Sequence, residues 1–385
     1  MSVNPCDKPK STPQQQIDLL KDNGVRFEIM GEDEALEFLT DHNFFFKLKA
    51  YDKNFDRYRS ESSGKKGRYV DLEFAYLVEL SRLDKELRYL VMAAALDIEH
   101  YIKVRLNRAI MDDEGCDGYQ IVEDFMLADA NRKAELVIKE LQTNGGIEEL
   151  RSASREISEI VARTSTGASH DDLLDVVGEL DTAKAHLENS LGNLDLNHIE
   201  KSIARLESSS YSKHVAEKYG HRRSMSYWAF LELATFGDII SFYKYYFNDV
   251  KNAKDESARR IKRTLFPTKV LRNAAAHNSC LLHELRTRSK QPVGKISQFI
   301  VENCDIDPGL IASTKRVPVV HDFGAMLITY DAIVISDSSR SEMASMLSNL
   351  SSRFMQHIDY FAKQAEVEQA LRMISEMARA FSFRM

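Results

Sequence analysis

A short run of residues in the second half of the chain combines a basic, an amide and an imidazole side chain at helical spacing. It reads Arg272-Asn273-Ala-Ala-Ala-His277. Asn273 and His277 are four residues apart, so on a helix they share one face, and the alanines between them keep that face low and open. We expect Arg272 at the helix start, where its long side chain reaches the same cleft. The run is a candidate for proton transfer beside a negatively charged group, since histidine titrates near neutral pH. The alternative interpretation is structural: the histidine forms a hydrogen bond with a neighbour in its helix, and the arginine forms a surface ion pair.

The same Arg-to-His spacing occurs once more, from Arg316 to His321. Its proline and β-branched residues predict extended chain there, and we interpret this copy as a chance match. Other enzyme motifs, such as a Walker loop, GxGxxG, GxSxG or HExxH, do not occur. The four cysteines lie far apart and form no CxxC pair, so a zinc knuckle or a disulfide framework is not expected. The sequence thus predicts no metal and no cofactor.

The charge of the chain is unevenly distributed. The net charge is −7, yet residues 251–295 hold twelve basic and three acidic residues, so this stretch carries +9 and the remainder −16. A local basic field attracts polyanions, and a solvated helix face would carry the same charges. The candidate residues for binding a polyanion such as a nucleic acid in this stretch are Arg259, Arg260, Lys262, Arg263 and Lys269.

Apolar periodicity predicts an all-α fold. Seven prolines and 16 glycines leave little material for the turns of an all-β protein. The strongest helical pattern spans 72–110, and Thr12 followed by Pro13 is typical of a helix start. A helix is predicted over 269–285, after Pro267, and the aromatic residues of 227–247 are predicted to lie mainly in the core. Plausible β material is confined to 317–323 and 332–336, although helix fits the latter equally well.

Four blocks of the sequence resemble the Abi-like (abortive infection) proteins of bacteria, of the AbiD and AbiF type, a branch of the HEPN superfamily. They are KPKSTPQQQIDLLKDNGV (8–25), HNFFFKLKAYDKNF (42–55), FAYLVELSRLDKELRYLVMAAALDIEHYIKVRL (74–106), and SMSYWAFLELATFGDIISFYKYY (224–246) followed by LRNAAAHNSCLLH (271–283). In the second block Phe-Lys stands in place of the family's usual Tyr-Arg. Residues 145–210 are longer than the usual connection, and the last third of the chain matches weakly.

The resemblance implies a HEPN-like helical bundle with a helical insertion and a C-terminal helical extension. The expected organisation is a first half of the helical domain (1–144), the insertion (145–210), the second half with the RNxxxH motif (211–290) and the extension (291–385). The extension and the insertion are also predicted to be helical by their own periodicity.

The resemblance also implies a metal-independent endoribonuclease, in which an RNA 2′-hydroxyl attacks the neighbouring phosphate. Arg272 and His277 are then the catalytic candidates and Asn273 the positioning residue, while Glu99 and Arg105 are structural or line the cleft. HEPN nucleases usually bring two RxxxxH motifs face to face, and the chain has one credible copy. A homodimer with a composite site is therefore implied.

Three hypotheses about function stay open at this point. The first is a cytoplasmic antiphage or toxin-like ribonuclease that acts on RNA, not DNA, and halts growth under the control of a non-coding RNA or a protein. The second is an RNA-binding regulator on the same scaffold, in which Arg272 and His277 grip phosphate without turnover. The third is a helical interaction protein that docks a partner through 145–210. No membrane association is expected, because no apolar run approaches the roughly 18 to 20 residues that a spanning helix needs.

Overall fold

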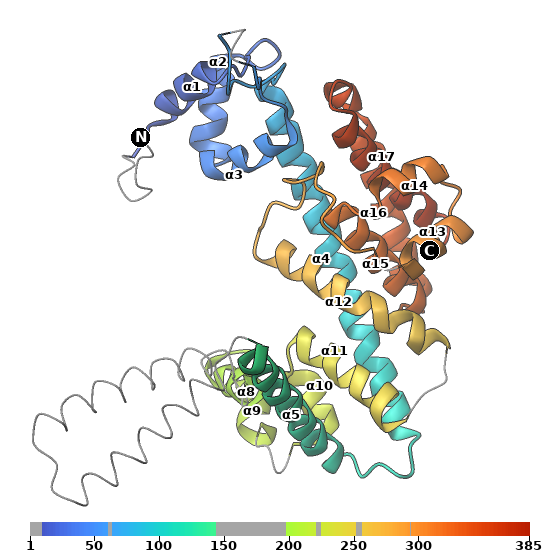
Figure 1. Ribbon diagram of the computed structural model, residues 1–385. Coiled ribbons are helices and arrows are strands. Elements are labelled where there is room, and N and C mark those ends of the chain that lie inside the picture. Colours follow the sequence, from blue (N-terminus) through green and yellow to red (C-terminus); the bar gives the residue numbers. More distant parts are fainter. Residues whose placement is uncertain (1–9, 61–63, 144–197, 221–224, 252–255, 293) are drawn as a thin grey trace, which may run out of the picture. The chain divides into compact units, whose positions relative to one another are not determined.

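The fold is all-α, as predicted. The computed structural model describes residues 10–60, 64–143, 198–220, 225–251, 256–292 and 294–385. These residues contain fifteen α-helices and no β-strand. They form two compact units, one of Met1–Ile102 with Phe247–Met385 and one of Lys103–Tyr246 (Figure 1). Within the described ranges, no helix is both long enough and apolar enough to cross a membrane.

The N-terminal part of the first unit starts as the sequence predicts. Helix α1 (Pro13–Asp22) is capped by Thr12, whose hydroxyl accepts from Gln15 N at 3.3 Å while the Gln15 amide oxygen accepts from Thr12 N at 2.9 Å. This reciprocal capping box satisfies two backbone donors that would otherwise lack partners. Two short helices follow, α2 (Glu32–Glu37) and α3 (Phe45–Lys49).

The long helix α4 (Phe74–Met111) matches the strongest predicted helical pattern to within two residues. Leu77, Leu80, Leu83 and Leu87 are each at most 1% exposed, so the apolar stripe read from the sequence faces the core. The boundary between the two units falls inside this helix, after Ile102.

Helix α12 (Glu256–Ala276) packs along α15 (Pro318–Ile333) in the first unit. Thirteen of the sixteen residues of α15 are buried, which makes it the central helix of this part. Buried threonine hydroxyls join the two helices, with Thr329 Oγ1 2.7 Å from Thr264 Oγ1 and 3.3 Å from Thr268 Oγ1. The β material expected at 317–323 is wrong, because Pro318 begins α15 instead of ending a strand.

Four further helices lie in the C-terminal part of the first unit. They are α13 (Gly294–Asn303), α14 (Pro308–Thr314), α16 (Asp337–Met355) and α17 (Ala365–Ser382). Helices α16 and α17 run side by side, and α13 and α17 both contact α15 (Figure 1). Arg353 of α16 joins α4 through Glu79, at 3.0 Å from Nη2 to Oε2, and through Glu86, at 3.1 Å.

The second unit is built on an aromatic core. Its helices are the end of α4 with α5 (Gln120–Thr143), α8 (His198–Arg205), α9 (Lys213–Tyr219), α10 (Tyr227–Leu233) and α11 (Phe236–Lys244). The rings of Phe125, Phe230 and Phe242 lie 5.0 to 5.6 Å apart, centroid to centroid. This confirms that the aromatic residues of α10 and α11 are mainly core. The predicted insertion falls mostly on 144–197, outside the described residues.

Candidate functional site

The Arg272 to His277 run lies at the C-terminal end of α12, not at the start of a helix. Helix α12 runs from Glu256 to Ala276, so the helix predicted over 269–285 is confirmed only for 269–276, and the position of Arg272 at a helix start is wrong. The cause of the helix end is Asn278, whose φ of 55° is left-handed. Ser279 N donates to Ala274 O at 2.9 Å and Asn278 N to Ala275 O at 3.0 Å, the pattern of a Schellman motif. His277 is therefore the residue that caps the helix.

The three candidate side chains are accessible to different degrees. His277 is exposed and makes no side-chain hydrogen bond within the described part of the chain, whereas Arg272 and Asn273 are half-buried. Arg272 Nη1 donates to Asn273 Oδ1 at 3.1 Å. Arg272 precedes His277 by five residues, which on a helix places it about 140° around the axis from His277. Asn273 precedes His277 by four residues and lies only about 40° away. The structure thus joins Arg272 to Asn273, and Asn273 shares the His277 side of the helix.

Two buried cations hold the turn that follows His277. Lys47 of α3 is 9% exposed, and its Nζ donates to Asn278 O at 3.0 Å and to Asn278 Oδ1 at 2.6 Å. Arg88 of α4 is 7% exposed, and its Nη1 lies 3.5 Å from Ser279 O. Burial, followed by the positive charge of Arg88, lowers the pKa of Lys47. Positive charge at the C-terminal end of a helix stabilises its free carbonyl groups, so both cations favour the observed helix end.

The segment after the turn is fixed by buried polar groups. Asp84 is fully buried, forms an ion pair with Arg88, and accepts from Leu282 N at 2.8 Å and from the Tyr51 hydroxyl at 3.0 Å. Asn54, also fully buried, donates to Leu282 O at 2.7 Å and accepts from Leu285 N at 2.8 Å. Side chains of the N-terminal part therefore form hydrogen bonds with both N–H and C=O groups of the irregular backbone that follows His277.

These anchoring residues were not recognised as part of a site from the sequence. Lys47, Tyr51 and Asn54 belong to the 42–55 block, and Asp84 and Arg88 belong to the 74–106 block. The available signal in the sequence was that both blocks carry the family resemblance. What the sequence lacked was the contact between blocks more than 180 residues apart, which only the fold supplies.

We expect Asn278→Ala to lower the free energy of unfolding by about 1–3 kcal/mol. Alanine at a φ of 55° is strained, and the change removes one of the two acceptors of the buried Lys47 ammonium. Asn278→Gly separates the two causes, because glycine tolerates the angle but also lacks the amide. Urea unfolding of both variants is the measurement. Equal stability of Asn278→Ala and the unchanged protein would contradict this account of the turn.

The RNA-binding candidates lie on α12, upstream of the motif. Lys262 and Arg263 are exposed and Lys269 is half-buried, while the side chains of Arg259 and Arg260 lie outside the described part. Two apolar residues accompany them on the surface, Phe266 at 60% and Val270 at 39% exposure. Phe266 and Val270 precede His277 by eleven and seven residues, so both fall within about 20° of its face.

The other candidates have separate surroundings. Glu99 and Arg105 both lie on α4 and are half-buried, on either side of the boundary between the units. Arg105 stacks on the Tyr243 ring, 5.9 Å from its centroid, which fits a structural role. In the second RxxxxH match, His321 is 3% exposed in the first turn of α15, and its Nδ1 lies 2.7 Å from Asp322 Oδ1. The expected extended chain there is wrong, but burial agrees with a chance match.

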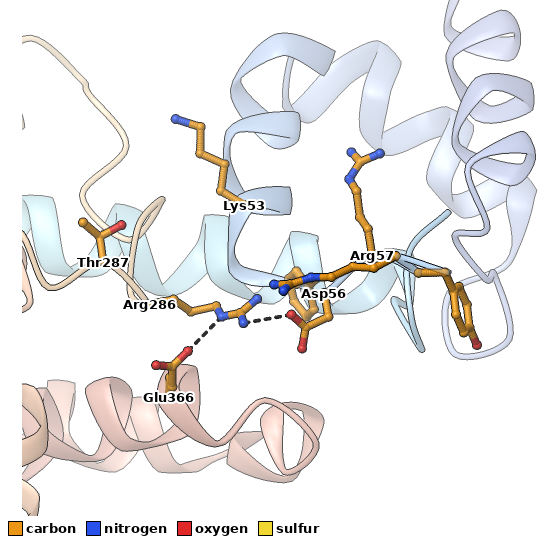
Figure 2. Close-up of a pocket in the computed structure, with 9 residues that line it drawn as sticks. Lys53, Asp56, Arg57, Arg286, Thr287 and Glu366 are labelled. Carbon is orange, nitrogen blue, oxygen red and sulfur yellow. Dashed lines mark hydrogen bonds and ion pairs between the residues drawn. The ribbon is translucent and has the colours of Figure 1, made fainter. Parts of the chain in front are cut away.

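A hollow lies where the anchored segment ends. It has a volume of about 440 Å³, and its lining includes Lys53, Arg57, Arg286 and Glu366. Arg286 lies between Asp56, at 2.8 Å, and Glu366, at 3.0 Å (Figure 2). Lys53 and Arg57 are also paired, with Lys53 Nζ 3.0 Å from Glu284 and Arg57 Nη2 3.5 Å from Asp52. The contacts describe an ion-pair network that ties the N-terminal part to α17.

Among the described residues, no group of three or more His, Cys, Asp or Glu side chains is placed to hold a metal ion. The family model described as Abi-like protein matches residues 37–283. That range includes α3, α4, α12 and every residue that anchors the turn after His277. Neither a curated protein nor a solved structure matches the chain.

Proposed function

Since the chain belongs to the Abi-like protein family and is on that ground an abortive-infection protein, we propose that it acts as a metal-independent endoribonuclease of the HEPN type. It cleaves RNA when triggered during infection and thereby halts growth. Arg272 and His277 carry the reaction, and Asn273 positions Arg272.

One observation supports this proposal more than any other. The exposed His277 imidazole lies at the end of α12, and the buried cations Lys47 and Arg88 bind the backbone of the turn that follows it. Arg272 and Asn273, in the last turns of the same helix, are hydrogen-bonded to each other. Because the ring is exposed and makes no hydrogen bond to the described part of the chain, both of its nitrogens are open to a bound molecule. An imidazole whose backbone is held in place and whose ring has no partner in the described part of the chain can exchange a proton with a substrate.

The reaction uses these side chains, the same motif of a second copy of the chain, and the RNA. His277 accepts the proton of a 2′-hydroxyl, and the oxygen attacks the adjacent phosphorus. The bond from phosphorus to the 5′-oxygen breaks, and that oxygen takes a proton from the protonated imidazole of His277 in a second copy of the chain. The products are a 2′,3′-cyclic phosphate and a 5′-hydroxyl. The Arg272 guanidinium neutralises the charge that builds up on the phosphorane oxygens.

A homodimer supplies a second histidine for the leaving oxygen. The chain offers one exposed RxxxxH copy in its described part, because His321 of the other match is buried. Phe266 and Val270 expose apolar surface on the His277 face of α12, and a second copy of the chain would cover it. The basic side chains nearby, Lys262 and Arg263, would lead RNA to the composite site.

The proposal predicts that cleavage requires the 2′-hydroxyl at the cut position. An oligoribonucleotide with a single 2′-deoxy nucleotide at its main cleavage site should lose that cut and keep the others, since the nucleophile is missing. The measurement is gel analysis of both oligonucleotides after incubation with the purified protein. A matched RNA with the deoxy nucleotide one position further on is the control.

Cleavage at the deoxy position would contradict attack by the 2′-hydroxyl. Binding of both RNAs without any cleavage, in the presence of the natural trigger, would favour the RNA-binding regulator instead. In that case Arg263→Gln should weaken binding and reduce its salt dependence.

A further inference from the structure

Two exposed aromatic residues are the sequence neighbours of the buried cations that hold the turn after His277. Phe46 of α3 is 82% exposed and Tyr89 of α4 is 62% exposed. Each is the next residue in sequence to one of the buried cations that hold the turn, Phe46 beside Lys47 and Tyr89 beside Arg88. Two separate elements thus present a ring to solvent next to the residue that contacts Asn278 or Ser279.

The fold gives these rings no core role. A large aromatic side chain buries 150–250 Å² in a typical core, and an exposed one gives up most of that stabilisation. Phe44, in the same block, is also 61% exposed, so the α3 region presents more than one ring. Positive charge accompanies the aromatic groups, with Lys85 Nζ 5.6 Å from the centre of the Tyr89 ring. Exposed rings among cations are typical of surfaces that bind single-stranded nucleic acid.

We propose that Phe46 and Tyr89 form a stacking site for two unpaired bases of the RNA whose backbone lies at His277. The inference rests on the proposed function and adds to it the residues that select the substrate. The Lys47 side chain reaches from the backbone next to Phe46 to Asn278, the residue next to His277, so one lysine length separates the Phe46 backbone from the turn and a flanking nucleotide can bridge it.

Such a site discriminates between RNA structures. A base in a duplex is already stacked and paired, and it must be unstacked and unpaired before it can move onto a protein ring. An unpaired base has both faces available, and any base can stack, so the site tolerates sequence and rejects duplex. The protein should therefore cut loops and unpaired regions of a target and spare its paired regions.

The test measures binding without cleavage. All variants are made in His277→Ala, and the probe is a short single-stranded RNA that carries 2-aminopurine, whose fluorescence falls when it stacks. Phe46→Ala and Tyr89→Ala should each raise Kd by roughly 5- to 150-fold, and the double variant should abolish the quenching. Phe46→Trp and Tyr89→Phe keep a ring and should keep the affinity.

The matched control is Phe383→Ala, which removes an equally exposed ring, 81%, at the end of α17. It should leave Kd unchanged. All these positions are on the surface, so circular dichroism should show folded protein throughout.

Unchanged affinity in the double variant would overturn the stacking site, and so would an equal loss from Phe383→Ala. A shift in sedimentation coefficient with no change in affinity would also overturn it, because the rings would then serve contacts between copies of the chain. If the rings are needed for binding but the protein with His277 intact never cleaves, the stacking site stands and the proposed nuclease falls.

Discussion

Replacement of His277 by alanine is expected to reduce RNA cleavage by about 10²- to 10⁴-fold, the contribution that a positioned acid or base makes to proton transfer. Stability should stay within about 0.5 kcal/mol, since the ring is exposed and makes no hydrogen bond in the described structure. The measurement pairs initial cleavage rates with urea unfolding of the same preparations. Growth arrest on expression of the protein should disappear together with cleavage.

His100→Ala is the matched control for this result, because His100 is also exposed and lies on a helix of the same unit. Arg272→Lys adds a second control, since it keeps the charge and loses the planar fork that can hold two phosphate oxygens. We expect full activity from the first and a partial loss from the second. A His277→Ala protein that cleaves as fast as the unchanged chain would show that the site lies elsewhere.

The largest loss of stability is expected from Asp84→Ala. The carboxylate is fully buried, and its removal leaves Arg88, 7% exposed, without its ion-pair partner. Leu282 N and the Tyr51 hydroxyl lose their acceptor at the same time. Removal of one partner of a buried pair costs about 3–5 kcal/mol, because the remaining charge stays desolvated. Urea unfolding should show this decrease.

Glu86→Ala is the comparison for Asp84→Ala. Glu86 also pairs with an arginine, Arg353 at 3.1 Å, but its side chain is 43% exposed, so we expect a loss below about 1 kcal/mol. If Asp84→Ala cost no more than Glu86→Ala, the buried network would not hold the segment after His277. The Asp84 variant should also cleave RNA more slowly than its folded fraction explains, since the His277 turn loses its support.

Local patterns of the sequence were enough to predict the first helix and the long helix α4. The capping box at Thr12 and the apolar stripe of α4 depend on residues within a few positions, and both are present. The helix predicted after Pro267 begins too late, because proline is typical of the first turn of a helix and not of its interior. In the structure Pro267 lies inside the helix, where burial of Ile261 and Leu265 on the same helix outweighs its missing hydrogen bond.

The site was predicted in part. The three motif residues were named from their spacing and the family resemblance, and their roles stay predictions. Lys47, Asp84 and Arg88, the buried charged residues around the turn after His277, could not be found in this way. A sequence does not show whether a charged side chain is buried or exposed. For Phe46 and Tyr89 the difficulty is the reverse. An aromatic residue in a helix is predicted to lie in the core, and only the fold shows that these two are exposed.

The most direct test of a metal-independent ribonuclease at His277 is end-group analysis of RNA cleaved in EDTA. The unchanged protein and His277→Ala are incubated with the same RNA, and the termini of the products are identified. We expect products with 2′,3′-cyclic phosphate and 5′-hydroxyl ends from the unchanged protein alone. Products with 5′-phosphate ends, or equal cleavage by both proteins, would contradict the account.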